Sequence, residues 1–213
     1  STLFPYTTLF RSEHVVEYTR AAVQAVFGRK PVWVALQAYT VKAVSDAGKS
    51  RDSVPRLATK DELRCMAYLA LASGARGILF YAFDDTYYNN GSIRGVNLAH
   101  ECPEFWEHLK ALAAELKGRA DVWTAPYSTL RPENLTPAVI VQERPYLVDG
   151  RAHLLAVNPT REEQSLRVRL PGAPKGGAVR DALSGRQLRL DGDVLADTLG
   201  PREPRCYVVD VRR

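Results

Sequence analysis

Two apolar segments with a helix-forming segment between them limit the fold of this 213-residue chain more than anything else in its sequence. Lys30–Tyr39 and Ile78–Phe83 are short, apolar and rich in β-forming residues, which is typical of buried strands. Two such strands joined by a crossover helix pair in parallel. The sequence therefore predicts an α/β unit across residues 30–85. Its functional edge should be formed by the carboxyl ends of the two strands.

The crossover helix has clear start and stop signals. Thr59 and Glu62 have the spacing of a capping box, in which each side chain accepts a hydrogen bond from the other residue's backbone N–H. Gly74 stands where a left-handed C-cap is needed, so the helix is predicted to run from Thr59 to Ser73. Cys65 falls among the apolar positions of this helix and is predicted to be a small core residue.

Two further helices are predicted to flank this unit. An apolar pattern at helical spacing covers residues 15–27, and this helix should end at Gly28. A second amphipathic helix should start at Pro103, with Trp106 on its apolar face. The stretch between the second strand and this helix, residues 84–102, is predicted to be irregular.

From Pro126 onward the pattern changes to short alternating segments separated by Asp-Gly, Asn-Pro, Pro-Gly and Ser-Gly pairs. Such closely spaced turns leave no room for helices and predict a small antiparallel β domain over residues 126–213, a sandwich or an open barrel. The segments expected to be strands are 138–143, 153–157, 165–170, 178–183, 187–190, 194–199 and 206–211.

The first residues of the chain do not resemble native protein. Thr2–Ser12 resembles one reading frame of a short-read sequencing adapter, so residues 1–12 are interpreted as a non-native artefact of assembling metagenomic sequence. The native sequence is then expected to begin near Glu13, within a longer gene. The remaining predicted boundaries are 13–125 for the α/β part and 126–213 for the β domain.

Composition and cysteine usage disfavour several functions. No apolar run approaches the roughly 20 residues of a membrane span. The net charge is only +5, and the scattered basic residues do not form the stripe with aromatics of a nucleic-acid site. The three cysteines include no Cys-x-x-Cys pair, and His100 and Cys102 lack a second pair of metal ligands at a usable spacing, so this stretch is predicted to be a solvated loop. We expect no metal, no cofactor, no membrane and no nucleic-acid partner.

The run from Lys30 to Phe83 resembles the closing part of a (β/α)8-barrel glycoside hydrolase, of the broad clan that includes cellulases and β-galactosidases. Pro31–Tyr39 resembles the seventh strand, Ala75–Phe83 the eighth strand, and the helix at Pro103 the last barrel helix. The resemblance implies an α/β plus all-β fold, in which the last two βα units of an incomplete barrel precede an antiparallel β-sandwich-like domain. It also implies a parent glycosidase acting on a poly- or oligosaccharide, of which this chain alone would be inactive.

The resemblance has one departure that bears on mechanism. In that clan the seventh strand usually ends in a nucleophilic Glu, whereas Leu36–Tyr39 contains no carboxylate, and an amide cannot form a covalent glycosyl intermediate. The missing carboxylate has three possible explanations: an inverting or otherwise divergent family, a misplaced register of the strand, or a non-catalytic barrel. The alternative function is a carbohydrate-binding or structural protein. Substrate sugar, linkage, stereochemistry, oligomeric state and compartment, extracytoplasmic or other, also stay open.

Alternation along the two strands selects the candidate substrate-binding residues. Gln37 and Tyr39 in the first strand, and Tyr81 and Phe83 in the second, are expected to point into the mouth of the barrel. Gln37 and Tyr81 can bind sugar hydroxyls, and Tyr39 and Phe83 can offer aromatic faces to a pyranose. The alternative is that Gln37 and Tyr81 are hydrogen-bonded barrel residues and that Phe83 belongs to the core.

Two acidic residues follow the second strand. Asp84 and Asp85 are weak candidates for catalysis, because paired carboxylates can have pKa values that are split apart. The alternative is a loop cap or a salt bridge to Arg94. The other catalytic carboxylate of the family would lie on a strand outside this chain.

Overall fold

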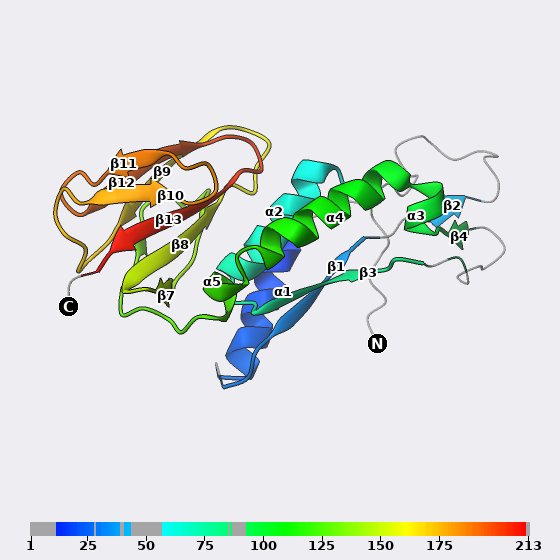
Figure 1. Ribbon diagram of the computed structural model, residues 1–213, viewed down its shortest axis with the longest axis horizontal. Coiled ribbons are helices and arrows are strands. Elements are labelled where there is room, and N and C mark those ends of the chain that lie inside the picture. The colour runs from blue at the N-terminus through cyan, green and yellow to red at the C-terminus, as the bar shows by residue number, and fades with distance from the viewer. Residues whose placement is uncertain are drawn as a thin grey trace.

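The computed structural model describes residues 12–27, 29–38, 41–43, 57–84, 86 and 93–211. Within this part of the chain, helices and a two-stranded parallel sheet come first and antiparallel sheets follow (Figure 1). The predicted helix end at Gly28 and the predicted site residues Tyr39 and Asp85 lie outside the described residues, as do residues 1–11.

The two predicted strands of the α/β unit form and pair in parallel, as the sequence indicates. They are β1 (Trp33–Gln37) and β3 (Gly77–Tyr81), with Gln37 directly opposite Tyr81 at their carboxyl ends. The predicted alternation is also observed, because Leu36 packs into the core that the helices cover while Gln37 and Tyr81 are exposed.

The crossover helix α2 (Lys60–Ala72) begins with the predicted capping box. The Thr59 hydroxyl accepts from the backbone N–H of Glu62 at 3.2 Å, and the Glu62 carboxylate accepts from the Thr59 N–H at 2.9 Å. After the C-cap residue Ser73, Gly74 has a φ of 102°, the left-handed conformation that the sequence predicts there.

The remaining helices and the strands that precede the β domain differ in part from expectation. The N-terminal helix ends at Ala25, and Phe27, two residues later, has a left-handed φ of 51°. The stretch predicted to be irregular contains a strand and a short helix, and a short helix also follows Lys117. The elements are α1 (Ser12–Ala25), β2 (Val41–Ala43), β4 (Ile93–Gly95), α3 (Leu98–Glu101), α4 (Pro103–Lys117) and α5 (Ala120–Thr124).

Two antiparallel sheets form the C-terminal part, as predicted. The larger has the strand order β11-β10-β13-β8-β6, with β7 also paired to β8, and the smaller has the order β12-β9-β5. The strands are β5 (Glu133–Asn134), β6 (Ile140–Val141), β7 (Tyr146–Val148), β8 (Arg151–Val157), β9 (Gln164–Arg169), β10 (Ala178–Asp181), β11 (Gln187–Arg189), β12 (Val194–Leu199) and β13 (Pro204–Asp210).

The central strand of the larger sheet, β8, is buried on both of its faces. Leu154 of β8 faces the smaller sheet and belongs to the core that the two sheets enclose. The neighbouring residue Leu155 faces the other way and packs with Tyr68 of α2. Helix α2 thus lies between the β1–β3 pair and the larger antiparallel sheet and contacts both, whereas α3 lies at the far end, beside β2 and β4 (Figure 1).

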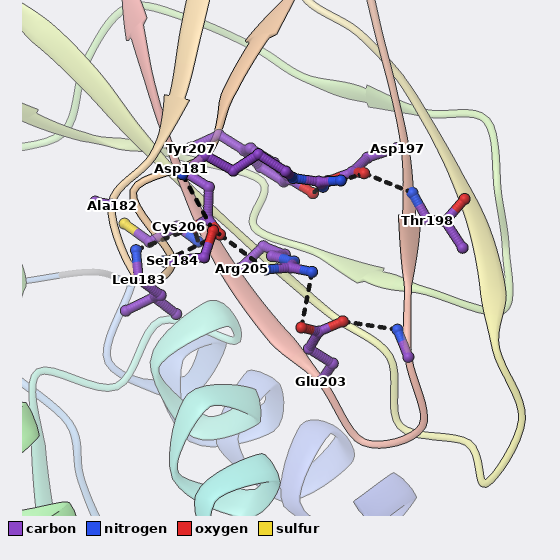
Figure 2. Close-up of polar contacts among 12 residues, drawn as sticks. Asp181, Ala182, Leu183, Ser184, Asp197, Thr198, Glu203, Arg205, Cys206 and Tyr207 are labelled. Carbon is purple, nitrogen blue, oxygen red and sulfur yellow. Dashed lines mark hydrogen bonds and ion pairs between the residues drawn. The ribbon is translucent and has the colours of Figure 1, made fainter.

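Polar contacts join the end of β10 to β13 within the larger sheet. Asp181, at the end of β10, has no exposed surface and accepts hydrogen bonds from the Cys206 N–H at 3.2 Å and from Arg205 Nη1 at 3.0 Å. Arg205 also pairs with Glu203 at 2.7 Å (Figure 2). Strand β10 stops two residues earlier than predicted, because the Asp181 carboxylate accepts from the backbone of the following turn, at Leu183.

The described residues contain no helix long and apolar enough to cross a membrane. Among the same residues, no cluster of His, Cys, Asp and Glu side chains could hold a metal ion. His100 and Cys102 do not lie in an irregular loop as predicted. They belong to α3 and its C-cap, because the Asn97 side chain accepts from the His100 N–H at 3.1 Å and so starts a helix.

Candidate active site at the carboxyl ends of β1 and β3

Gln37 and Tyr81 lie side by side at the carboxyl ends of the parallel pair. They are opposite one another in the β1–β3 register, and neighbouring strands lie about 4.8 Å apart. The ladder continues one step further, because the Ala38 N–H donates to the Tyr81 carbonyl at 2.6 Å. Both side chains are on the face of the pair that the helices leave uncovered, and Tyr81 is 51% exposed.

Phe83 continues the same face beyond the end of β3. Its side chain is 48% exposed, and its ring lies 5.0 Å from that of Trp106 on α4, tilted by 59°. The Leu98 N–H donates to the Phe83 carbonyl at 2.9 Å, which attaches the strand end to α3. Phe83 is therefore a half-exposed aromatic residue supported by Trp106, rather than a member of the closed core.

Asp84 has a well-defined hydrogen-bonding role in the loop after β3. One carboxylate oxygen accepts from the Thr86 N–H at 3.0 Å and from the Thr86 hydroxyl at 2.7 Å, and the other accepts from Asn97 Nδ2 at 2.9 Å. The bonds from Thr86, with that from Asn97, hold the pKa of the Asp84 carboxyl below its ordinary value. A general acid needs the opposite shift, and this geometry favours the loop-cap alternative.

The residue that anchors Asp84 was not recognised in the sequence. Asn97 pairs with Asp84 through an isolated antiparallel bridge, and its side chain caps α3. The available signal was an Asn placed just before a short helix-forming run, which is a common N-cap arrangement. Strands β2 and β4 also pair near this end of the β1–β3 pair, so the end is built from more elements than predicted (Figure 1).

The uncovered face of β1 and β3 is apolar away from its carboxyl end. Trp33 is 63% exposed and Leu79 is 50% exposed. Gly77 lies opposite Trp33, and a Cβ at this glycine would come within 2.8 Å of the indole ring, so the ring packs over the bare backbone. Exposed apolar side chains on one continuous face are typical of a surface that another element covers.

Comparison with protein-family models and with curated protein sequences finds no match. Solved structures do match the fold. A GH27 β-L-arabinopyranosidase from Geobacillus stearothermophilus, in complex with arabinose, aligns with a TM-score of 0.55 and 18% identity over 96% of this chain and 43% of that chain. An α-amylase from Geobacillus thermoleovorans, complexed with acarbose, gives a TM-score of 0.57 and 15% identity over 94% and 43%. A maltogenic α-amylase from Thermotoga neapolitana gives 0.54 and 13% over 95% and 49%.

These neighbours define the class of fold. The chain is a mixed α/β protein with antiparallel sheets and a glycosidase-like fold, and it spans less than half the length of each of these three enzymes. They are an arabinopyranosidase and amylases rather than the cellulases and β-galactosidases that the sequence resembles. At identities below 20% the likeness concerns the fold and does not extend to substrate or catalytic residues.

Proposed function

We propose that this chain is the C-terminal part of a glycoside hydrolase acting on a poly- or oligosaccharide. In this proposal residues 13–125 form the last two βα units of an incomplete (β/α)8 barrel, residues 126–213 form a β domain that supports the barrel, and residues 1–12 are not native. Support comes from the parallel β1–β3 pair, which has helices on one face and an exposed second face. In a barrel that second face points inward.

Within this proposal, Gln37 and Tyr81 bind the hydroxyl groups of the substrate. The observation that carries the assignment is their side-by-side placement at the carboxyl ends of two parallel strands, because barrel enzymes build their active sites at that edge. Phe83, with Trp106 beside it, offers an aromatic face for a sugar ring, and Tyr39 is proposed for the same task. The catalytic carboxylates are expected on other strands of the barrel, since both oxygens of Asp84 are engaged by the loop.

The alternative in which the β domain itself binds carbohydrate through aromatic side chains receives no support. Tyr146 and Tyr207, which belong to β7 and β13, are both fully buried. A sugar-binding platform needs exposed ring faces. The β domain is therefore assigned the supporting role.

The proposal is tested by two variants in the enzyme that contains this chain. Gln37→Ala and Tyr81→Phe each remove one hydrogen bond to a sugar hydroxyl, which is worth about 1–3 kcal/mol. Since 1.4 kcal/mol is about a factor of ten, kcat/KM should fall roughly tenfold to a hundredfold. The Tm should hardly change, because both side chains are exposed.

Matched controls are available away from this edge. Tyr18 on α1 is 51% exposed, as Tyr81 is, and Gln187 on β11 is also exposed. Tyr18→Phe and Gln187→Ala should leave kcat/KM unchanged. A fall in Tm with unchanged kinetics for the Gln37 and Tyr81 variants would show that these residues have a structural role and would refute the assignment.

A further inference from the structure

A pocket lies at the opposite end of the β1–β3 pair from the candidate active site. Its volume is about 440 Å³, within the range of about 300–1,000 Å³ that is usual for small-molecule sites. Arg29 and Lys30, which precede β1, and Arg76, which precedes β3, belong to its wall. Each strand spans roughly 16 Å, so this pocket is separate from Gln37 and Tyr81. Its lining residues come from the segments where the two strands begin and from the end of α1, and Figure 1 shows these segments next to one another.

Most of the charged side chains in the wall of this pocket are cationic. They are Arg20, Arg29, Lys30, Arg76 and Arg144. Glu143 is the carboxylate in the same wall, and it pairs with Arg20 at 3.5 Å. The ends of α1 and α2 also reach the pocket, and each helix C-terminus carries about half a negative charge. The positive charge in the pocket wall therefore exceeds the negative charge from Glu143 and the two helix ends.

Two of the arginines are held in place by an aromatic ring. The guanidinium carbons of Arg76 and Arg144 lie 4.1 Å and 4.3 Å from the ring centroid of Tyr127. Arg76 Nη1 also donates to the carbonyls of Trp123 at 2.9 Å and Ala125 at 2.6 Å. A guanidinium fixed in this way loses little conformational freedom when a ligand binds.

The wall also contains buried polar groups without a partner. Gln142 is 2% exposed, and its Oε1 accepts from the Leu155 N–H at 3.1 Å, which sets the orientation of the carboxamide. Its Nε2 then has no hydrogen-bond partner among the described residues, and neither does the hydroxyl of Ser73, which is 7% exposed. Buried polar groups are nearly always satisfied, and two exceptions in the wall of one pocket indicate a ligand or a water that it holds.

We propose that this pocket binds a small oxyanion, a ligand that carries a carboxylate or a phosphate group. The planar donor fork of arginine matches both groups and can bind either through two parallel hydrogen bonds. Gln142 and Ser73, whose side-chain donors have no partner among the described residues, line the same pocket. A neutral sugar would leave the excess positive charge unpaired. The site is independent of the carbohydrate function proposed for the other end of the strands.

The full chain is titrated by isothermal calorimetry with inorganic phosphate, D-glucuronate and D-glucose at constant ionic strength. Saturable binding is expected for one or both anions and not for glucose, and the tighter anion identifies the preferred group. Arg29→Glu should weaken anion binding about tenfold to a hundredfold, because hydrogen bonds to charged groups are the strong ones. Arg189→Glu, a matched change at an exposed residue of β11, should leave it unchanged.

Two further measurements keep the result independent of folding. Ser73→Ala should weaken anion binding without lowering the Tm of the unliganded chain, because it removes a hydroxyl that has no partner. The side-chain amide resonances of Gln142 in NMR spectra should shift as the anion is added. The proposal is overturned by the absence of saturable anion binding, by equal binding of glucose, by equal weakening in the Arg29 and Arg189 variants, or by unmoved Gln142 resonances.

Discussion

At the scale of single residues, the clearest electrostatic feature is the buried carboxylate of Asp181. Burial alone would raise its pKa, but hydrogen bonds from Ser184, Leu183, Cys206 and Arg205 outweigh burial and hold the pKa below its ordinary value. The ionised form is therefore the one that the fold stabilises. The ion pair with Arg205 joins β10 to β13, so Asp181 helps to hold two neighbouring strands of the larger sheet together (Figure 2).

We predict that Asp181→Asn lowers the free energy of unfolding at pH 7 by about 3 kcal/mol, the low end for breaking a buried ion pair, since Arg205 loses its buried carboxylate partner and keeps only Glu203. Asp210→Asn, an exposed change on the same strand as Arg205, is the control and should have little effect. Urea unfolding of both variants measures the difference. Equal stabilities would refute this role of the ion pair.

The same carboxylate predicts a pH dependence. Because the folded-state pKa of Asp181 lies below the unfolded value of about 3.9, its stabilisation is fully present above pH 5 or so and is lost as the pH falls through the folded-state pKa. The stability of the wild-type chain should thus fall more steeply below about pH 4 than that of Asp181→Asn. If the free energy of unfolding fell equally with decreasing pH in the two proteins, the prediction would be wrong.

Thiol reactivity gives a second prediction at this scale. Burial raises the pKa of Cys65 and of Cys206 to about 12, whereas Cys102 is only partly buried. Since the thiolate is the reactive form, iodoacetamide at pH 8 should label Cys102 in the folded chain and all three cysteines only after unfolding. Mass spectrometry of the labelled peptides tests this. If Cys65 in the folded chain reacted as fast as it does in urea, its thiol would be accessible to the reagent and the prediction would be wrong.

At the scale of elements, α2 depends on its capping box. Thr59→Ala removes the side-chain acceptor of the Glu62 N–H and should cost about 1 kcal/mol of stability. Thr59→Ser keeps the hydroxyl and should restore most of that loss. Urea unfolding curves of the two variants give the values, and an alanine variant as stable as the serine variant would argue against the cap.

Most of the α/β unit could be predicted because its signals are local. The capping box, the left-handed Gly74 and the alternation along β1 and β3 each follow from residues close in sequence. The residues at the carboxyl ends of the strands could be placed for the same reason: Gln37 and Tyr81 emerge opposite each other, as expected. Asn97 could not be placed, because its partner Asp84 is 13 positions away in the sequence.

Other elements could not be predicted, because their few residues show no sequence pattern that is typical of a strand. Strands β5 and β7 have only two and three residues, and β2 exists through its pairing with β4, which is distant in sequence. Periodicity also indicates that a helix face is buried without identifying what covers it. The packing of Tyr68 against Leu155, and the pocket beside Gln142, depend on which surfaces of the two parts meet.

At the scale of the whole molecule, the helices pack against the antiparallel sheet on one side and against the β1–β3 pair on the other. Tyr68 and Leu69 of α2 pack with Leu155 and Cys206 of the larger sheet. We therefore predict that residues 13–117 expressed alone are insoluble or lack fixed tertiary packing, because the strand edges and this second apolar surface are both uncovered. The full chain is the control, compared by size-exclusion chromatography and thermal melting. A sharp, cooperative melt from a monomer of residues 13–117 would contradict the prediction.

Helix α2 has apolar partners on opposite sides, and this restricts how the protein can change during evolution. Ala67 and Ala70 are fully buried, so a longer side chain at either position would push apart layers that belong to different parts of the fold. Compensation would need simultaneous changes in both neighbouring layers. Sequence drift should therefore be slow along α2, and faster at the outward-facing positions of strands such as β9 and β10. A lineage that loses the small residues of this helix is expected to lose both parts together.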